Sequence, residues 1–279
     1  MHVKTLVVMA TNRGQFIATD QFEAIEWSHS ESFLMVIVDG GGAIDSPFGP
    51  EPGPREYAVI PNKLMPKLNL SGFITYQGIQ WAIDQGITFD RVLVLDDDAL
   101  PIGLHLDIWA RLEMEKCDVD LLGVRDRVNY QMWWPSRGAF VRDLCTELPA
   151  DFAPTAETIF FASHWMSRKF VDRLVERRFL APEKYETWDL WPDVYISWLC
   201  QALGFQTQFA GSMENPEAPV YANHPKEHQR WSPAPMILHP NFKIYHSIRG
   251  CSGVDEVTIR EHYQAVRHSQ VSDGLHDCC

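Results

Sequence analysis

The chain has 279 residues, 46% of them hydrophobic and 22% charged, so it is long enough to bury a core as one large domain or two small ones. Its formal net charge of −13 argues against a nucleic-acid partner, because phosphate contacts need clustered Lys and Arg, which are absent. No stretch approaches the roughly 20 apolar residues that span a bilayer, and the N-terminus lacks a secretory pattern, so we expect a cytoplasmic protein without a transmembrane segment.

The six cysteines are scattered without metal-ligand spacing, which favours reduced thiols. The final pair, Cys278 and Cys279, has the composition of a lipidation site, but no polybasic stretch lies near it to support an anchor. Both alternatives, modified and unmodified, stay open.

Two short apolar runs near the N-terminus are typical of buried parallel strands, residues 6–10 and residues 33–38. Between them, Ala18, Phe22 and Ile25 follow the i, i+4, i+7 spacing of a helix. The first forty residues therefore predict one βαβ unit and a parallel sheet.

The next segments alternate in the same way. Residues 43–56 are rich in Pro and Gly and predict a loop, and residues 57–60 predict a short strand. Apolar spacing predicts a helix over residues 72–86, ending at a glycine suited to a left-handed cap. Residues 91–95 predict a buried strand that runs directly into three consecutive aspartates.

The second half continues the alternation around an irregular stretch at residues 125–156. Ser163 is the expected N-cap of one of its helices. Strands are predicted at 119–124, 158–162 and 242–245, and helices at 104–116, 163–178, 192–203 and 254–267. The chain thus predicts one α/β domain over residues 1–250 and a C-terminal helix with a polar tail over residues 251–279.

The three aspartates that follow the 91–95 strand, Asp96, Asp97 and Asp98, are the strongest chemical signal. The crevice beyond the carboxyl ends of parallel strands is where open α/β sheets bind ligands. Adjacent carboxylates repel one another, so they imply a bound cation or full hydration. Oxygen ligands favour Mg²⁺ or Mn²⁺, and a rigid preceding strand favours this metal site over a solvated turn.

In this order the segments resemble the GT-A glycosyltransferases, and within them the inverting family two. The resemblance covers roughly residues 4–250 and rests on four motifs, at residues 6–13, 36–42, 72–86 and 92–101. It implies a GT-A fold, which is α/β with a mostly parallel central sheet flanked by helices.

The resemblance also implies roles for individual residues. Asp39 would contact the base of a donor nucleotide, with Thr11 and Arg13 lining the same pocket. Asp96 would contact the ribose or metal, and Asp98 the metal-bound diphosphate. Within the same acidic run, Asp97 is assigned to cofactor binding. The alternative for Asp39 is a turn cap beside the following glycine.

The segment from residue 188 to residue 195 is similar to the family's acidic motif at a helix start. Asp193 is the predicted catalytic base, which takes the proton of the acceptor hydroxyl. The family usually has Glu before this Asp, whereas Pro192 stands here, so Asp189 is an alternative base. Asp193 as a carboxylate that only stabilises the helix dipole also stays open.

A late histidine is an additional metal ligand in many GT-A enzymes, and His246, after a short apolar run, is the candidate here. His224, His228 and His239 compete with it. A histidine with a purely structural role is the alternative for each of them.

Together the aspartate run and the resemblance predict a glycosyltransferase that uses Mn²⁺ or Mg²⁺, a nucleotide-sugar donor (a UDP-sugar being favoured) and a carbohydrate or other hydroxyl acceptor. The resemblance alone implies inversion. A sugar-nucleotide nucleotidyltransferase is one alternative, although residues 11–14 supply only a faint version of the Gly-rich basic loop that it needs. A non-catalytic carbohydrate-binding or scaffold protein is another, because the acidic motif is altered.

Overall fold

The computed structural model describes residues 1–41, 57–62, 71–127, 157–181, 192–212, 220–222, 243–246 and 255–273. Its helices are α1 (Gln15–Ser28), α2 (Ser71–Asp84), α3 (Leu106–Lys116), α6 (Arg168–Glu176), α8 (Pro192–Ala202) and α10 (Glu256–Asp273). Its strands are β1 (His2–Thr11), β2 (Phe33–Asp39), β3 (Tyr57–Pro61), β4 (Thr88–Asp96), β5 (Leu100–Pro101), β6 (Leu121–Arg127), β7 (Glu157–Ser167), β8 (Thr207–Ser212), β9 (Val220–Ala222) and β10 (Ile244–His246).

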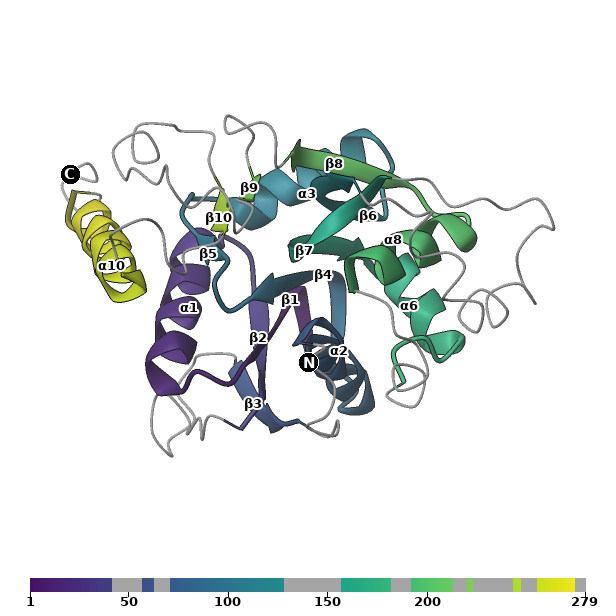
Figure 1. The fold of residues 1–279 in the computed structure, drawn as a ribbon, viewed down its shortest axis with the longest axis horizontal. Helices are drawn as coiled ribbons and strands as arrows, with labels where there is room; N and C mark the ends of the chain where they lie inside the picture. Colours follow the sequence, from purple (N-terminus) through teal and green to yellow (C-terminus); the bar gives the residue numbers. More distant parts are fainter. Residues whose placement is uncertain are drawn as a thin grey trace.

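Seven strands form the central sheet in the order β3-β2-β1-β4-β7-β6-β8 (Figure 1). The first four in this order pair in parallel, and so do β6 and β8. Only β7 runs antiparallel to both of its neighbours, β4 and β6. The predicted fold class, α/β with a mostly parallel central sheet flanked by helices, is confirmed.

Side chains of successive strand residues point to opposite faces, and this alternation divides the core into two layers. In β4, Val92 and Val94 pack with α2, α6 and α8, whereas Leu93 and Leu95 pack with α1 and α3. Strands buried on both faces read as continuous apolar runs, which is why the strands were visible in the sequence.

The order of the strands locates the ligand-binding end of the sheet. The chain leaves β1 through α1 to β2 and then β3, and α2 carries it back to β4 on the other side of β1. Right-handed crossovers in opposite directions put α1 and α2 on opposite faces. The carboxyl ends of β1 and β4 therefore flank the switch point, where open α/β sheets bind ligands.

The prediction that a helix begins after Ser163 is wrong about its first residue. β7 continues to Ser167, and α6 is capped by Ser167, whose Oγ accepts a hydrogen bond from the Phe170 amide at 3.2 Å. Ser163 is buried and pairs with Leu95 of β4. The ladder with β4 outweighs the local capping signal, as tertiary contacts commonly do.

Three very short strands form a second sheet beside the end of β4. Of these, β10 overlaps the strand predicted at residues 242–245, whereas β5 and β9 were not predicted. β10 pairs antiparallel with β5 and parallel with β9. β8, in the central sheet, was also missed. Residues 125–127, predicted to be irregular, are the end of β6, and residues 128–156 lie outside the described part of the chain.

The C-terminal helix α10 packs against α1, on the opposite flank from α6 and α8 (Figure 1). Its buried residues, Ile259, Arg260, Tyr263 and Arg267, follow helical spacing and form one face. The predicted C-terminal helix is thus docked on the domain through a face of two apolar residues and two arginines. Among the described helices, none is both long and apolar enough to cross a membrane.

A titratable ring lies in the core beside α1. His29 stacks on Trp165 with ring centroids 6.1 Å apart, and its Nδ1 is 3.2 Å from the Ile25 carbonyl. The residue as a whole is partly exposed, but its Nε2 is buried. Burial lowers the pKa of His29 to about 4, although the charge of Asp107 acts in the opposite direction.

We expect His29 to make stability depend on pH. The unfolded ring titrates near 6.5, so the unfolded state takes up the proton first as the pH falls. The contribution is intact above pH 6.5 and is lost towards pH 4, by up to roughly 3 kcal/mol. Urea denaturation at pH 7.5, 6 and 5 measures this slope, and His29→Gln should flatten it. An unchanged slope in the variant would contradict the assignment.

Candidate active site

Three neighbouring strands end together at the switch point. The register pairs Thr11 of β1 with Asp39 of β2, and Ala10 of β1 with Asp96 of β4. The predicted residues Thr11, Asp39 and Asp96 therefore come to one edge of the sheet. The edge gathers acidic groups from β2 and β4 around the end of β1.

The middle aspartate of the run is directed to the protein interior. Thr11 Oγ1 donates to Asp97 Oδ2 at 2.7 Å, and Arg13 Nη1 lies 3.7 Å from Asp97 Oδ1. Asp97 is only 5% exposed. The structure thus brings Thr11, Arg13 and Asp97 together, and a direct contact of Asp97 with a donor stays a prediction.

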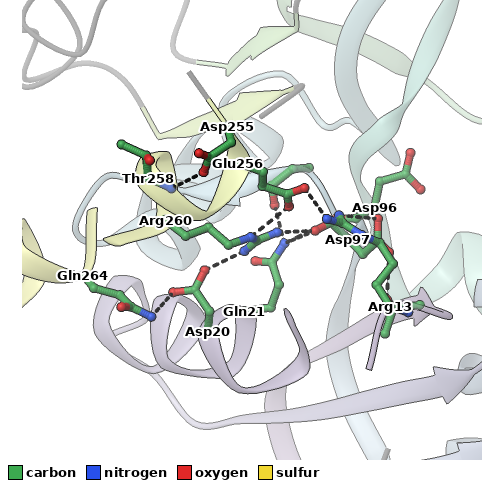
Figure 2. A network of polar contacts seen from close by, with 12 residues as sticks. Arg13, Asp20, Gln21, Asp96, Asp97, Asp255, Glu256, Thr258, Arg260 and Gln264 are labelled. Atoms are coloured by element: carbon green, nitrogen blue, oxygen red, sulfur yellow. Dashed lines mark hydrogen bonds and ion pairs between the residues drawn. The ribbon is translucent and has the colours of Figure 1, made fainter. Parts of the chain in front are cut away.

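The two flanking aspartates differ from it in position. Asp96 continues the alternation of β4 towards the α2 face and is partly exposed, and Figure 2 shows its side chain pointing away from Arg13 and the neighbouring polar cluster. Asp98 is buried and contributes negative charge near Arg13. Burial lowers the pKa of Arg13, but its hydrogen bond to Glu256 and the charges of Asp97, Glu256 and Asp98 outweigh this and raise the pKa.

Asp39 forms the turn that was its alternative role. Its Oδ1 accepts a hydrogen bond from the Gly41 amide at 2.9 Å, and the Gly40 amide donates to the Thr11 carbonyl at 2.8 Å. Gly41 has φ +111°, a conformation that other residues rarely adopt. Because Asp39 remains partly exposed, this turn is compatible with the predicted contact to a nucleotide base.

The small sheet carries the predicted histidine to the same place. Tyr245 pairs with Leu100 and Ile244 with Pro101, so the antiparallel register sets the backbone of His246 next to Ala99, directly after the aspartate run. Only the backbone of His246 is described. Its role as a metal ligand stays a prediction.

The predicted catalytic base lies at the start of a helix, as expected. Asp193 is the second residue of α8, whose later residues are buried against the sheet. Its side chain, and the whole of Asp189, lie outside the described part of the structure, as do His224, His228 and His239.

A chain of alternating charges, which sequence reasoning missed, connects α10 to this edge. Three arginines and three carboxylates form it in the order Arg267, Asp20, Arg260, Glu256, Arg13 and Asp97 (Figure 2 shows all but Arg267). Arg260 Nη1 lies 2.5 Å from Asp20 Oδ2, and Arg260 Nε lies 2.9 Å from Glu256 Oε1. The charges balance along this chain, and within it Arg13 bridges Glu256 and Asp97. The i, i+4 spacing of Glu256 and Arg260 was the one available signal.

The donor chemistry of the edge fits a hard divalent cation completed by its substrate. In the described ranges, no group of three or more His, Cys, Asp or Glu side chains is arranged to hold a metal ion. Mg²⁺ commonly takes only one or two carboxylates and fills its remaining positions with water and substrate phosphates. Asp96 and Asp98 match that requirement in number and in chemistry.

Comparison with known proteins gives distant structural likenesses only. No family model and no curated protein matches the chain. The mannosyltransferase PcManGT from Pyrobaculum calidifontis, in complex with GDP-Man and Mn²⁺, is 11% identical with a TM-score of 0.45, and the match covers 76% of this chain and 55% of that one. The chain therefore spans about half the length of that enzyme.

Two further structures are similar at the same level. Core-mannan synthase A (CmsA/Ktr4) from Aspergillus fumigatus, in an Mn/GDP form, is 9% identical with a TM-score of 0.46, over 74% of this chain and 72% of that one. A197 from STIV is 12% identical with a TM-score of 0.38, over 75% and 82%. At these identities and TM-scores the likeness assigns neither a donor nor a mechanism.

Proposed function

We propose that this protein is a metal-dependent glycosyltransferase that moves a sugar from a nucleoside-diphosphate sugar to a hydroxyl acceptor. The observation that carries the proposal is the position of Asp96 and Asp98 at the carboxyl end of β4, at the switch point of the sheet. Arg13, a permanent cation, lies near Asp98. This edge therefore combines two ligands for a metal ion with a positive group for a phosphate.

In the proposed site, Asp96 and Asp98 hold Mn²⁺ or Mg²⁺, and His246 is an added ligand. The bound ion supplies positive charge that stabilises the leaving diphosphate, usually the largest kind of catalytic contribution. Asp39 contacts the base of the nucleotide, for which uridine is the proposed identity. Thr11 holds the Asp97 carboxylate, which in turn orients Arg13 towards the same edge.

Transfer is proposed to proceed by direct displacement with inversion. The acceptor oxygen forms a bond to the anomeric carbon while the bond from that carbon to the diphosphate oxygen breaks, and the electron pair leaves with the nucleoside diphosphate. Asp193 accepts the proton of the acceptor hydroxyl.

The role of Asp193 has its own test. Asp193→Asn should lower kcat at least about a hundredfold, because a positioned base contributes that much to rate, and should leave donor affinity unchanged. Asp189→Asn is the matched variant in the same segment and should keep most of the activity. The reverse ranking in steady-state kinetics would make Asp189 the base.

The proposed function is tested by a thermal-shift screen of UDP, GDP, ADP and CDP, each with and without Mn²⁺. A ligand that binds only the folded state raises its apparent stability, and at a hundred times Kd the gain is about 2.7 kcal/mol. We expect at least one diphosphate to raise the melting temperature only when Mn²⁺ is present. If no diphosphate does so, the assignment of a donor site to this edge is wrong. Release of pyrophosphate from a nucleoside triphosphate and a sugar phosphate would instead identify a nucleotidyltransferase.

A further inference from the structure

We propose that Arg260 of α10 is a positioning residue that fixes the backbone of the Asp96–Asp98 turn and so sets the affinity of the site for its divalent cation. The inference rests on the proposed function, because it concerns the same cation. It assigns to the C-terminal helix a part in the donor site, from which it is distant in sequence.

The contacts of Arg260 define the orientation of its guanidinium group. Arg260 is fully buried, and its Nη2 donates to the main-chain carbonyl of Asp97 at 2.6 Å. Its two other nitrogens donate to Asp20 at 2.5 Å and to Glu256 at 2.9 Å. A planar group with all three nitrogens engaged has one orientation, so the Asp97 peptide is held at a fixed position.

A second side chain restrains the same turn from α1. Gln21 Nε2 donates to the carbonyl of Asp97 at 3.2 Å and to that of Ala99 at 3.0 Å. Within the turn, the Ala99 amide donates to the Asp96 carbonyl at 3.1 Å. Two helices thus hold the peptide between the proposed ligands, and the direction in which each carboxylate leaves the chain depends on that peptide.

The anchor of Arg260 explains why α10 is able to hold the turn. Asp20 of α1 is 1% exposed and accepts hydrogen bonds from Arg260, Arg267 and Gln264 (Figure 2 shows the first and the last). Any shift of α10 along α1 would separate these buried charges. Arg267 shares this anchor, but its described contacts do not include the aspartate turn, so it is a natural control.

Loss of the Arg260 charge and loss of its hydrogen-bond geometry would change the affinity for the metal ion in opposite directions. The variant must therefore separate the two effects. Removing a buried cation near the site would by itself favour a bound metal ion. Lysine keeps the charge but has a single ammonium group in place of the planar fork of arginine. Arg260→Lys therefore removes the planar hydrogen-bonding group and keeps the positive charge. Arg267→Lys makes the same change in the same ionic chain.

The experiment measures Mn²⁺ binding to the full chain by electron paramagnetic resonance, with and without UDP, for the wild type, Arg260→Lys and Arg267→Lys. Arg260→Lys should weaken Mn²⁺ binding about tenfold or more, because replacing a residue that orients metal ligands typically lowers metal affinity about 10- to 100-fold. Arg267→Lys should stay within about twofold of the wild type on the same reasoning, whatever its effect on melting temperature. Hydrogen exchange of the Ala99 amide in metal-free protein should accelerate in Arg260→Lys only.

Each outcome decides the inference. Equal Mn²⁺ affinity in the two lysine variants, or equal exchange at Ala99, overturns it while leaving the proposed function intact. Absence of Mn²⁺ binding in the wild type overturns both. If Arg260→Lys does not fold, as judged by circular dichroism, Gln21→Met replaces it, because this variant removes the other restraint on the same peptide and should also weaken Mn²⁺ binding. Unchanged affinity in Gln21→Met would then overturn the inference.

Discussion

Replacing Asp98 with Asn is expected to abolish the Mn²⁺-dependent thermal shift with a nucleoside diphosphate and to lower sugar transfer by at least about a thousandfold. A metal ion supplies several kcal/mol of charge stabilisation to a leaving group, and each 1.36 kcal/mol is tenfold in rate. Asp98 is buried in the turn that follows β4, so a rigid strand positions its carboxylate. Asp96→Asn should have an effect of the same order.

The controls for this prediction lie on β4 and in the turn that follows it. Asp90→Asn removes an exposed carboxylate that pairs with Lys4 at 2.9 Å, and it should leave the shift and the rate unchanged. Asp97→Asn should mainly lower stability, because it removes the partner of Thr11 and Arg13. If Asp98→Asn retains an Mn²⁺-dependent shift of wild-type size, the two-carboxylate metal site is disproved.

The Asp20→Asn variant is expected to lose about 3 to 5 kcal/mol of unfolding free energy, because breaking a buried ion pair leaves charge without compensation. Asp20 is 1% exposed and is the shared partner of Arg260 and Arg267, which are themselves buried. Asparagine preserves the shape of the side chain while removing its charge. Urea denaturation of the wild type and the variant measures the difference directly.

Asp172→Asn on α6 provides the contrast. Asp172 forms an exposed ion pair with Arg168 at 2.7 Å, and pairs of this kind contribute at most about 1 kcal/mol. In a double-mutant cycle, adding Arg267→Gln to Asp20→Asn should recover part of the loss, because one uncompensated cation is then gone. An Asp20→Asn variant as stable as Asp172→Asn would mean that water reaches the ionic chain.

The sequence predicted those parts of the fold whose signals are local. β1, β2, α1 and β4 were visible because strands buried on both faces are continuous apolar runs and the crossover helix has a 3.6-residue period. Parallel strands joined by such helices then imply a central sheet with a layer of helices on each face. The predicted boundaries were short of the observed ones, since polar residues at strand ends, such as Asp39, belong to the ladder without carrying an apolar signal.

The features that the sequence did not predict depend on partners distant in the chain. β5 has two residues and β9 three, too few for any periodicity, and both join a sheet only by pairing with β10, which overlaps the strand predicted at residues 242–245. Ser163 has the composition of a helix cap, yet its place in a ladder with β4 decides its conformation.

In the candidate site, too, the features with a local signal were predictable and those that depend on distant partners were not. The position of Asp96, Asp97 and Asp98 at a strand end followed from the apolar residues before them. That Asp97 turns inward was not predictable, because its partners Thr11 and Arg13 are themselves ordered by the rest of the edge. The part played by α10 required knowing that Arg260 lies against the aspartate turn, which no local pattern specifies.

The pairing of β5 with β10 has a consequence for synthesis on the ribosome. The aspartate turn emerges before the strand that sets His246 beside it and before the helix that holds the Asp97 peptide. A nascent chain that ends at α8 therefore lacks part of the proposed catalytic edge, even though its central strands are already translated. The proposed edge is complete only when α10 has been translated and has folded back onto α1 and the aspartate turn.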